Sequence, residues 1–556
     1  MVHASSRGER VPLFAPWARG YTRSWIRFDV LAGLSAAAVV IPQALAYATI
    51  AGLPVQVGLY CALVPMVVYG LLGSSRTLSV STTSTLSILT AEAIATAGSG
   101  NDPLTVASTL AVTAGVLLVV AGVMRLGFLA DFISRPVLVG FKVGMGITIA
   151  VGQLGNILGV PVTGDGVFRK LGSAFSQLPD ASVETVAAAA VTVITLIVLR
   201  RVAPRVPGPL VVLIGGIVAV AVFGLGGVAT VATVPTGLPL PTMPDFSLVW
   251  HLLPSAAGVA LMAFTESISA ARTFHAKHDP PVDADRELLA LGAASLAGGF
   301  FRAYPSGGGL SQTAVNSGSG ARSQAAGLAT AAVVALTLLV LAPAFSDLPL
   351  AVLGGIVLMV ALGLAELSGL HDLRSFRLAE FRLALVAAVG VLLLGVLNGI
   401  LVAVLISLLV LLWELNHPPI VILGRDPRSG AYRRITGDGD LASTPGLLIV
   451  RVESRLFFAN ARRVMARLRD VVVSGDPLPA VVVLDASAIT DIDVTAADAF
   501  EQLRDDLAAR GIDLWVARLE GRTLDLEMRR PRWADDHQGR VYPTLDAAVE
   551  AFQSRS

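Results

Sequence analysis

The chain has 556 residues, of which 54% are hydrophobic and only 15% are charged, and its mean hydropathy is +0.73. This apolar content exceeds the roughly 45 to 50% that is usual for soluble domains, so an ordinary cytosolic enzyme is excluded. The 41 Lys and Arg residues balance 40 Asp and Glu residues, so the sequence carries no electrostatic footprint for nucleic acid. The single cysteine, Cys61, excludes an intramolecular disulfide framework and a thiolate metal cluster.

A short basic segment precedes the apolar part of the chain. Residues 1–28 hold five arginines and two tryptophans, which is typical of a segment at the cytoplasmic lipid surface. Residues 30–75 contain no charged side chain, and similar runs recur to about Trp413, each near the ~20 residues that cross a bilayer. Division at Gly, Pro and charged interruptions gives about fourteen segments, two of them short. We therefore predict a transmembrane domain over residues 29–415.

Lys and Arg residues indicate the orientation, because they collect in cytoplasmic loops. Those of the membrane region, from Arg76 to Arg377, fall mainly in loops that the segment count places inside. Arg169, Lys170 and Arg302 are exceptions near predicted outer turns. The even number of segments puts both termini on one side. We expect a multi-pass protein of the cell membrane with both termini in the cytoplasm.

The composition changes to charged, amphipathic sequence after His417-Pro418-Pro419, which marks a second domain over residues 416–556. Strand-like and helical runs then alternate. The strand-like runs are residues 446–454, 481–487 and 513–520, and the helical runs are residues 459–473 and 495–509. This alternation predicts a small cytoplasmic α/β domain with a sheet covered by helices.

Two polar interruptions lie at corresponding places in the two halves of the membrane region. Residues 78–85, LSVSTTST, precede the apolar run 86–97, and residues 304–313, YPSGGGLSQT, interrupt the second half. The two halves are therefore predicted to form an inverted repeat in which the third helical segment of each half is short. Unwound backbone at membrane depth is tolerated only when it is buried in protein or lines a cavity. A matched pair of such breaks indicates the binding site of a transporter.

The breaks also predict the charge of the ligand. Each half-helix N-terminus leaves about four free N–H groups and carries about +0.5 charge, so two facing termini favour an anion. Neutral side-chain donors add to these groups. They are Ser81, Thr82, Thr83, Ser311, Gln312 and Thr313, with Gln43 in the first span. Helix capping or packing explains any one hydroxyl equally well, whereas the paired arrangement is more specific.

Glu266, in GVALMAFTESISAA, is the predicted coupling residue. An ionised carboxylate inside the membrane is costly and would repel a nearby anion, so we expect anion and proton to enter together. A sodium ion beside the carboxylate would neutralise it equally, and a structural hydrogen bond is the alternative role. Glu92 and Glu366 are weaker candidates because each lies nearer a span end.

Four segments together resemble one family of membrane proteins. They are residues 32–60, AGLSAAAVVIPQALAYATIAGLPVQVGLY; residues 71–81, LLGSSRTLSVS; residues 282–292, VDADRELLALG; and residues 306–327, SGGGLSQTAVNSGSGARSQAAG. From about Phe28 to the C-terminus the chain resembles the SulP family of anion permeases and exchangers. The tail resembles a STAS domain, the sulfate-transporter and anti-sigma-antagonist module, through VVVLDASAITDIDVTAADAF.

The resemblance implies a polytopic α-helical domain of fourteen segments in a seven-plus-seven inverted repeat, divided into core and gate subdomains. It implies a homodimer and an elevator-like movement of the core. It also implies an anion between the third and tenth helix termini, near a glutamine of the first span and an acid of the eighth. These positions are Ser81, Thr82, Thr83, Ser84, Leu310, Ser311, Gln312 and Thr313, with Gln43 and Glu266.

Three positions depart from the family pattern. Many members have Gly-Pro where this chain has Ser81-Thr82. Some animal relatives have Arg where this chain has Gln312. The neutral Gln312 predicts an anion site without a fixed cation. Thr495, followed by Ala496, stands where anti-sigma antagonists carry a phosphorylated serine, so we do not expect phosphorylation there.

The leading hypothesis is proton-coupled secondary transport of a small anion of the sulfate, bicarbonate or dicarboxylate class. Sodium-coupled bicarbonate uptake and anion exchange are alternatives, and an anion-sensing receptor that signals through the STAS domain is an alternative of another class. We expect no enzyme activity, because Glu266 has no catalytic partner in the sequence. We also expect no cofactor or metal, since His275 and His278 read as solvated residues. Expected partners are lipid, a second copy of the chain, and a cytoplasmic protein or nucleotide at the STAS domain.

Overall fold

The computed structural model of the chain divides into two compact units, Met1–Ser407 and Leu408–Ser556. It describes residues 14–18, 21–98, 100–128, 134–164, 166–204, 206–223, 227–231, 234–275, 279, 281–365, 367–435, 444–475, 477–519 and 540–555. Most of the predicted N-terminal segment, together with Glu366 and His278, lies outside these residues.

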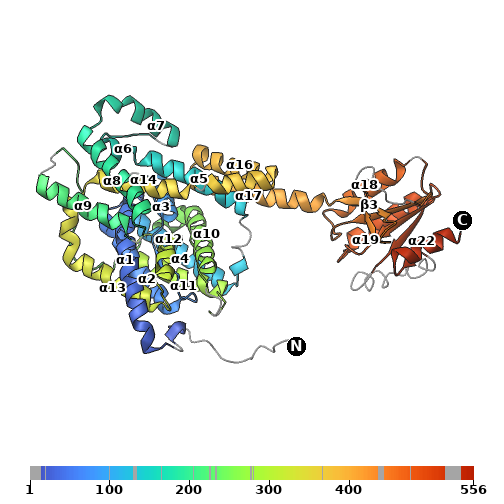
Figure 1. Cartoon of the computed structure of the whole chain (residues 1–556), viewed down its shortest axis with the longest axis horizontal. Helices are drawn as coiled ribbons and strands as arrows, with labels where there is room; N and C mark the ends of the chain where they lie inside the picture. Colours follow the sequence, from blue (N-terminus) through green and yellow to red (C-terminus); the bar gives the residue numbers. More distant parts are fainter. Residues whose placement is uncertain are drawn as a thin grey trace. The chain divides into compact units, whose positions relative to one another are not determined.

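The first unit is helical, and its helices follow the same order in both halves (Figure 1). The first half contains α1 (Arg23–Ile50), α2 (Val55–Leu72), α3 (Ser84–Ala97), α4 (Pro103–Val123), α5 (Arg135–Gly152), α8 (Val183–Val202) and α9 (Gly208–Phe223). The second contains α10 (Val249–Thr273), α11 (Ala284–Phe300), α12 (Leu310–Gly318), α13 (Ala325–Leu336), α14 (Leu350–Leu364), α16 (Leu378–Leu394) and α17 (Val396–Asn416). The predicted seven-plus-seven arrangement is confirmed.

The third helix of each half is short, and an extra helix follows the fifth. Helix α3 has 14 residues and α12 has nine, so neither spans the ~30 Å hydrocarbon core at 1.5 Å per residue. The extra helices are α7 (Val167–Ser176), which follows the five-residue α6 (Leu154–Leu158), and α15 (Leu367–Phe376). Eight helices within the described residues are long and apolar enough to cross a membrane by length and composition.

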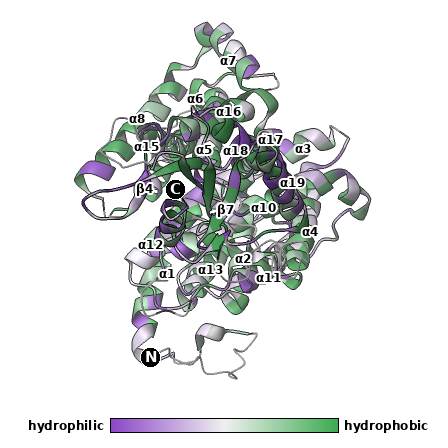
Figure 2. Cartoon of the chain, turned by 90° about the vertical axis from the view of Figure 1, so that its right-hand side faces the viewer, coloured by the Kyte–Doolittle hydropathy of each residue, from purple (hydrophilic) through white to green (hydrophobic). Residues whose placement is uncertain are grey.

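The packing of these helices follows the repeat. Helix α1 packs on α13 as α10 packs on α4, and α5 packs on α16 as α8 packs on α14. One group, α1 to α4 with α10 to α13, forms the core subdomain. The other group, α5, α8, α9, α14 and α16, forms the gate subdomain, and Ala403 packs α17 against α5 and α16. Figure 2 shows hydrophobic residues along the helices of both groups, as expected for helices exposed to lipid.

The two breaks pair with each other. Strand β1 (Val80–Ser81) precedes α3, strand β2 (Gly307–Gly308) precedes α12, and the strands pair antiparallel, with Val80 opposite Gly308. A Cβ at position 308 would lie 2.6 Å from the side chain of Leu78, so a larger residue there would require this side chain to move. The pairing satisfies part of the backbone that each break exposes.

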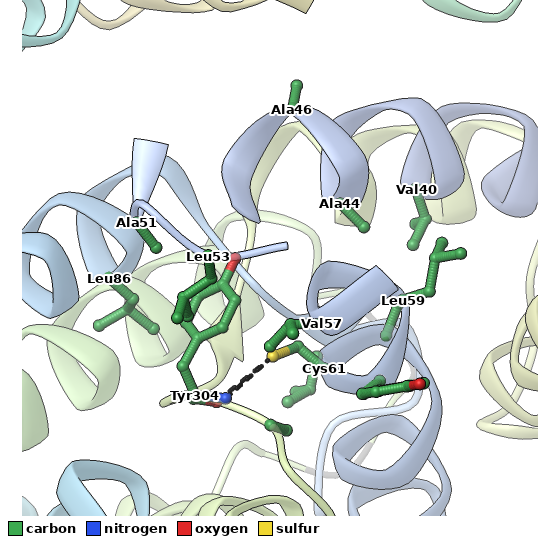
Figure 3. Close-up of a cluster of buried hydrophobic side chains, with 14 of the residues drawn as sticks. Val40, Ala44, Ala46, Ala51, Leu53, Val57, Leu59, Cys61, Leu86 and Tyr304 are labelled. Atoms are coloured by element: carbon green, nitrogen blue, oxygen red, sulfur yellow. Dashed lines mark hydrogen bonds between the residues drawn. The ribbon is translucent and has the colours of Figure 1, made fainter. Parts of the chain in front are cut away.

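Cys61 and Tyr304 attach the second break to α2. The Tyr304 N–H donates to Cys61 Sγ at 3.2 Å, as Figure 3 shows, and the thiol donates to the Tyr304 carbonyl oxygen at 3.5 Å. The Tyr304 hydroxyl accepts a 2.5 Å hydrogen bond from Thr82 in the first break. Cys61 is fully buried, so it acts as a small core residue.

The second unit is a six-stranded sheet with helices on both faces. Its strands are β3 (Ile420–Arg425), β4 (Tyr432–Arg434), β5 (Leu447–Val452), β6 (Val481–Asp485), β7 (Asp513–Ala517) and β8 (Val541–Tyr542), in the order β4-β3-β5-β6-β7-β8. Strands β5 to β8 run parallel. Helices α18 (Ala461–Val473) and α19 (Val494–Ala508) pack on one face, and α22 (Leu545–Gln553) packs on the other. The predicted α/β domain is confirmed.

A buried carboxylate connects the three central strands. Asp485, at the end of β6, accepts hydrogen bonds from Arg451 Nε at 2.6 Å and Arg518 Nε at 2.9 Å, and its side chain is fully buried. Burial opposes ionisation of Asp485, but the hydrogen bonds from Arg518 and Arg451 outweigh it and lower the pKa of the carboxyl group below its usual range. The ionised cluster therefore stabilises the sheet.

We expect Asp485→Asn to lower the free energy of unfolding of the second unit by about 2 to 3 kcal/mol at neutral pH, because two partly exposed arginines lose their counter-charge. The folded-state pKa is depressed, so this contribution is complete above the unfolded value of about 3.9 and is lost as the pH falls below it. Urea unfolding, followed by near-ultraviolet circular dichroism, should show the wild-type advantage shrinking below about pH 4. A difference that stays constant down to pH 3 would contradict this prediction.

Candidate anion site between the broken helices

The N-termini of α3 and α12 meet at one cavity but differ in how they are capped. Thr83 caps α3 by accepting the Leu86 N–H at 3.3 Å. Helix α12 has Gly309 at its N-cap and no side-chain cap. The first N–H groups of α12, beginning at Leu310, lack intrahelical acceptors by helix geometry. The end of α12 is therefore the better donor for an external anion.

The cavity has a volume of about 510 Å³ and lies between the core and gate subdomains. The core contributes Gln43, Tyr47, Thr82, Thr83, Ser84, Thr85, Thr265, Glu266, Ser269, Gly308, Gly309, Leu310, Ser311 and Gln312. The gate contributes Leu138, Lys142, Val360, Gly363 and Leu364. Eight of the ten residues predicted from the sequence therefore line one cavity.

Ser81 and Thr313 do not line the cavity, although both were predicted to contact the anion. The Ser81 hydroxyl donates to Gln312 Oε1 at 2.6 Å, and the Thr313 hydroxyl accepts the Ser79 N–H at 3.1 Å. Both residues are fully buried. Their hydroxyl groups hold the paired breaks together instead of facing a ligand.

Gln312 connects three parts of the core. Its Nε2 donates to Gln43 Oε1 and to the Thr82 carbonyl oxygen, each at 3.3 Å, while its Oε1 accepts from Ser81. The Gln312 side chain is thereby fixed between α12, α1 and the first break. Because Gln43 uses its carbonyl oxygen in this contact, its amide N–H groups are the part that can serve a ligand.

Glu266 on α10 is held by the first turn of α3. Thr83 Oγ1 donates to its carboxylate at 3.1 Å, and Thr85 donates to the other oxygen. The positive end of α3 thus already faces a carboxylate, whereas the end of α12 faces none among the described lining residues. The two helix ends have different roles, which spacing in the sequence could not reveal.

Lys142 is the charged site residue that the sequence did not reveal, beside the neutral Tyr47, Thr85, Thr265 and Ser269. It lies on α5, lines the cavity, and interacts electrostatically with Glu266. The expectation of a site without a fixed cation is therefore wrong, because the gate supplies the positive charge. Lys142 lies within the apolar segment of residues 135–152, and an ionisable residue inside a span is itself a signal of function.

A second cavity of about 370 Å³ adjoins the first and shares Gln43, Ser311 and Val360 with it. It is also lined by Arg200, in the last turn of α8. The shared residues indicate an access route to the first cavity from the C-terminal end of α8.

Glu92 and His275, the described residues among the remaining acidic and histidine candidates, do not line this cavity. Glu92 is near Gly395, at the start of α17, and does not line the cavity. No group of three His, Cys, Asp or Glu residues suited to a metal ion occurs among the described residues.

Comparison with known proteins identifies the family. The sulfate permease family matches residues 26–387, and the STAS domain family matches residues 440–548. A probable sulfate transporter of Mycobacterium tuberculosis is 36% identical over 97% of this chain and 99% of its own length. The chloroplastic sulfate transporter 4.1 of Arabidopsis thaliana is 30% identical over 90% of this chain and 76% of its own length.

The chain belongs to the sulfate permease family. It is a multi-pass anion transporter with a C-terminal STAS domain, and it is not an enzyme. The fold agrees with that of the murine solute carrier 26 family member A9 anion transporter in the inward-facing state, with a TM-score of 0.88, 22% identity, and coverage of 100% of this chain and 96% of the other. The transmembrane domain of a cyanobacterium bicarbonate transporter gives a TM-score of 0.61 and 23% identity, and covers 70% of this chain and 98% of the other.

We expect Lys142→Gln to raise the half-saturating anion concentration about tenfold or more, because the cavity loses its cation at low dielectric. Lys142→Arg should retain most of the affinity. Concentration-dependent uptake of labelled sulfate into proteoliposomes measures this.

Arg135→Gln is the matched control, since Arg135 lies on the same helix but is exposed, and among the described residues its ion pair is a 3.9 Å surface contact with Asp372. Equal losses in Lys142→Gln and Arg135→Gln would contradict a specific role for Lys142.

Proposed function

We propose that this permease carries a small anion of the sulfate, bicarbonate or dicarboxylate class together with a proton, and that Glu266 binds the proton. The observation that carries the proposal is the charge of the cavity lining. Lys142 and Glu266 are the two charged side chains among its described residues. With Glu266 ionised their charges cancel, and with Glu266 protonated the lining has a charge of +1. Protonation thus prepares the cavity for an anion.

The position of the carboxylate supports this coupling. Glu266 shares Thr83 with the N-terminus of α3, so a change in its charge acts directly on the helix end beside the anion. The hydroxyls of Thr83 and Thr85 can donate to an ionised carboxylate or accept from a protonated one. Both protonation states therefore have hydrogen-bond partners at the same position. A sodium ion beside Glu266 would also cancel its charge, so the test must separate the two cations.

The lining also supports an elevator-like movement. The hydrogen-bonding groups proposed to contact the anion, Gln43 and the end of α12, belong to the core together with Glu266, whereas the gate contributes mainly apolar residues and Lys142. A core that moves against the gate would carry these groups with it and change their distance from Lys142. We further propose a homodimer in the cell membrane, with both termini in the cytoplasm and a cytoplasmic protein or nucleotide at the STAS domain.

We expect wild-type uptake of labelled sulfate or bicarbonate to increase when the pH is lowered on the side of entry. Glu266→Gln resembles the protonated residue, so its uptake should persist at neutral pH and lose most of its pH dependence. Proteoliposomes with imposed proton or sodium gradients, tested with a panel of anions, measure both effects.

Glu92→Gln is the control for removing a membrane carboxylate outside the cavity, and it should retain the wild-type pH profile. If wild-type flux responds to a sodium gradient but not to a proton gradient, sodium is the coupling ion. Flux that ignores both gradients would indicate exchange or uniport, and the absence of anion flux would favour a receptor.

A further inference from the structure

A separate cavity lies on the other face of the membrane domain. It has a volume of about 420 Å³ and is lined from α5, α6, α7, α8 and α14, all in or next to the gate. Helix α7 follows the fifth span, so this region lies on the side opposite the chain termini. It shares no residue with the transport cavity. Its function is not explained by the transport site.

The cavity contains a lysine in a predicted outer loop, where lysine is uncommon in membrane proteins. Lys170 on α7 is the one charged side chain among its described lining residues. No described residue forms an ion pair or hydrogen bond with its ammonium group. Lysine is disfavoured in outer loops of membrane proteins, so its position in this cavity calls for a reason. An unpaired cation in a concave site favours an anionic ligand.

Two helix N-termini add to the positive potential. Helix α14 begins at Leu350 without a side-chain cap, and both Leu350 and Ala351 line the cavity. Helix α8 begins at Val183, and Thr185 in its first turn also lines the cavity. An N-terminus contributes about +0.5 charge, which Glu184 in the first turn of α8 partly offsets. No carboxylate belongs to the described lining.

Thr185 gives an independent indication of a ligand. The residue is only 4% exposed, lines the cavity, and has its backbone N–H bonded to Ser182 Oγ at 3.3 Å. No described residue makes a hydrogen bond with its hydroxyl group. The hydroxyl oxygen is not sealed inside the protein, since it is not one of the fully buried side-chain atoms without a partner. A hydroxyl that is accessible at the wall of a cavity that also contains Lys170 can donate to an oxyanion.

The walls of the cavity are fixed by backbone hydrogen bonds. The Leu350 N–H donates to the Ala229 carbonyl oxygen at 2.9 Å, and the Ser182 N–H donates to the Leu158 carbonyl oxygen at 3.0 Å. At Gly152, on the cavity wall, a Cβ would meet no atom within 4 Å. The space beside Gly152 is therefore available to a ligand without rearrangement of the helices.

We propose that this cavity is a second anion site, which binds a small oxyanion such as sulfate on the side of the membrane opposite the termini. Lys170 supplies the charge, Thr185 donates a hydrogen bond, and the N-terminus of α14 at Leu350 and Ala351 adds positive potential. The site is separate from the transport cavity and does not depend on the coupling mechanism proposed above.

Hydrogen exchange of the full-length protein, with sulfate or with gluconate at equal ionic strength, tests the proposal. We expect sulfate to slow exchange in α7 and in the first turns of α8 and α14 of the wild type. Lys170→Gln should abolish this protection, and Gly152→Val, which fills the cavity without changing its charge, should do the same. Arg169→Gln is the matched control, because Arg169 is exposed and does not line the cavity.

Protection that is absent in the wild type, persists in Lys170→Gln, or is lost equally in Arg169→Gln would overturn the proposal. Selective loss in Lys170→Gln and Gly152→Val, with retention in Arg169→Gln, would support it. Peptides from α3 and α12 report on the transport site in the same experiment. If sulfate does not slow exchange in the α3 and α12 peptides, the proposed transport site is contradicted. The result for the α7 peptides is still interpretable, because the two cavities are separate.

Discussion

The antiparallel pairing of two unwound segments inside the membrane domain is the constraint on which the site depends. Backbone groups at membrane depth need partners, and β1 and β2 supply them to each other through the register of Val80 opposite Gly308. This pairing fixes where α3 and α12 begin. Ser81 and Thr313 reinforce it through their hydroxyl groups. The transport cavity therefore forms where α3 and α12 begin, and the N–H groups of their first turns lie beside it.

The N-termini of α3 and α12 differ chemically, so the two sides of the site have different roles. Helix α3 engages Glu266 through Thr83 and Thr85, whereas α12 has no side-chain cap. One end is thus suited to a titratable carboxylate and the other to a substrate anion. Lys142 approaches from the gate, so the balance of charge at the site involves both subdomains. Relative movement of the subdomains would change the electrostatic interaction between Lys142 and Glu266.

The second unit uses buried charge for another purpose. Asp485 joins Arg451 and Arg518 across three neighbouring strands, and its carboxyl group stays ionised because these hydrogen bonds outweigh the cost of burial. The cluster lies at the carboxyl ends of parallel strands and is fully partnered. Glu266, in contrast, lies at the wall of a cavity where a ligand or a proton can reach it. Accessibility separates the structural carboxylate from the proposed functional one.

The sequence alone determined the fourteen helical segments, the two breaks and the α/β tail, because hydrophobic length, Gly and Pro interruptions and strand-helix alternation are local properties. It also located Gln43, Glu266 and six further residues of the cavity lining, since helix ends must be polar where they begin inside a membrane. Only the tertiary structure decided which hydroxyl groups face the cavity, and it showed that Lys142 enters it from another subdomain. Side-chain direction and contacts between distant helices depend on packing, which residue spacing along one segment does not encode.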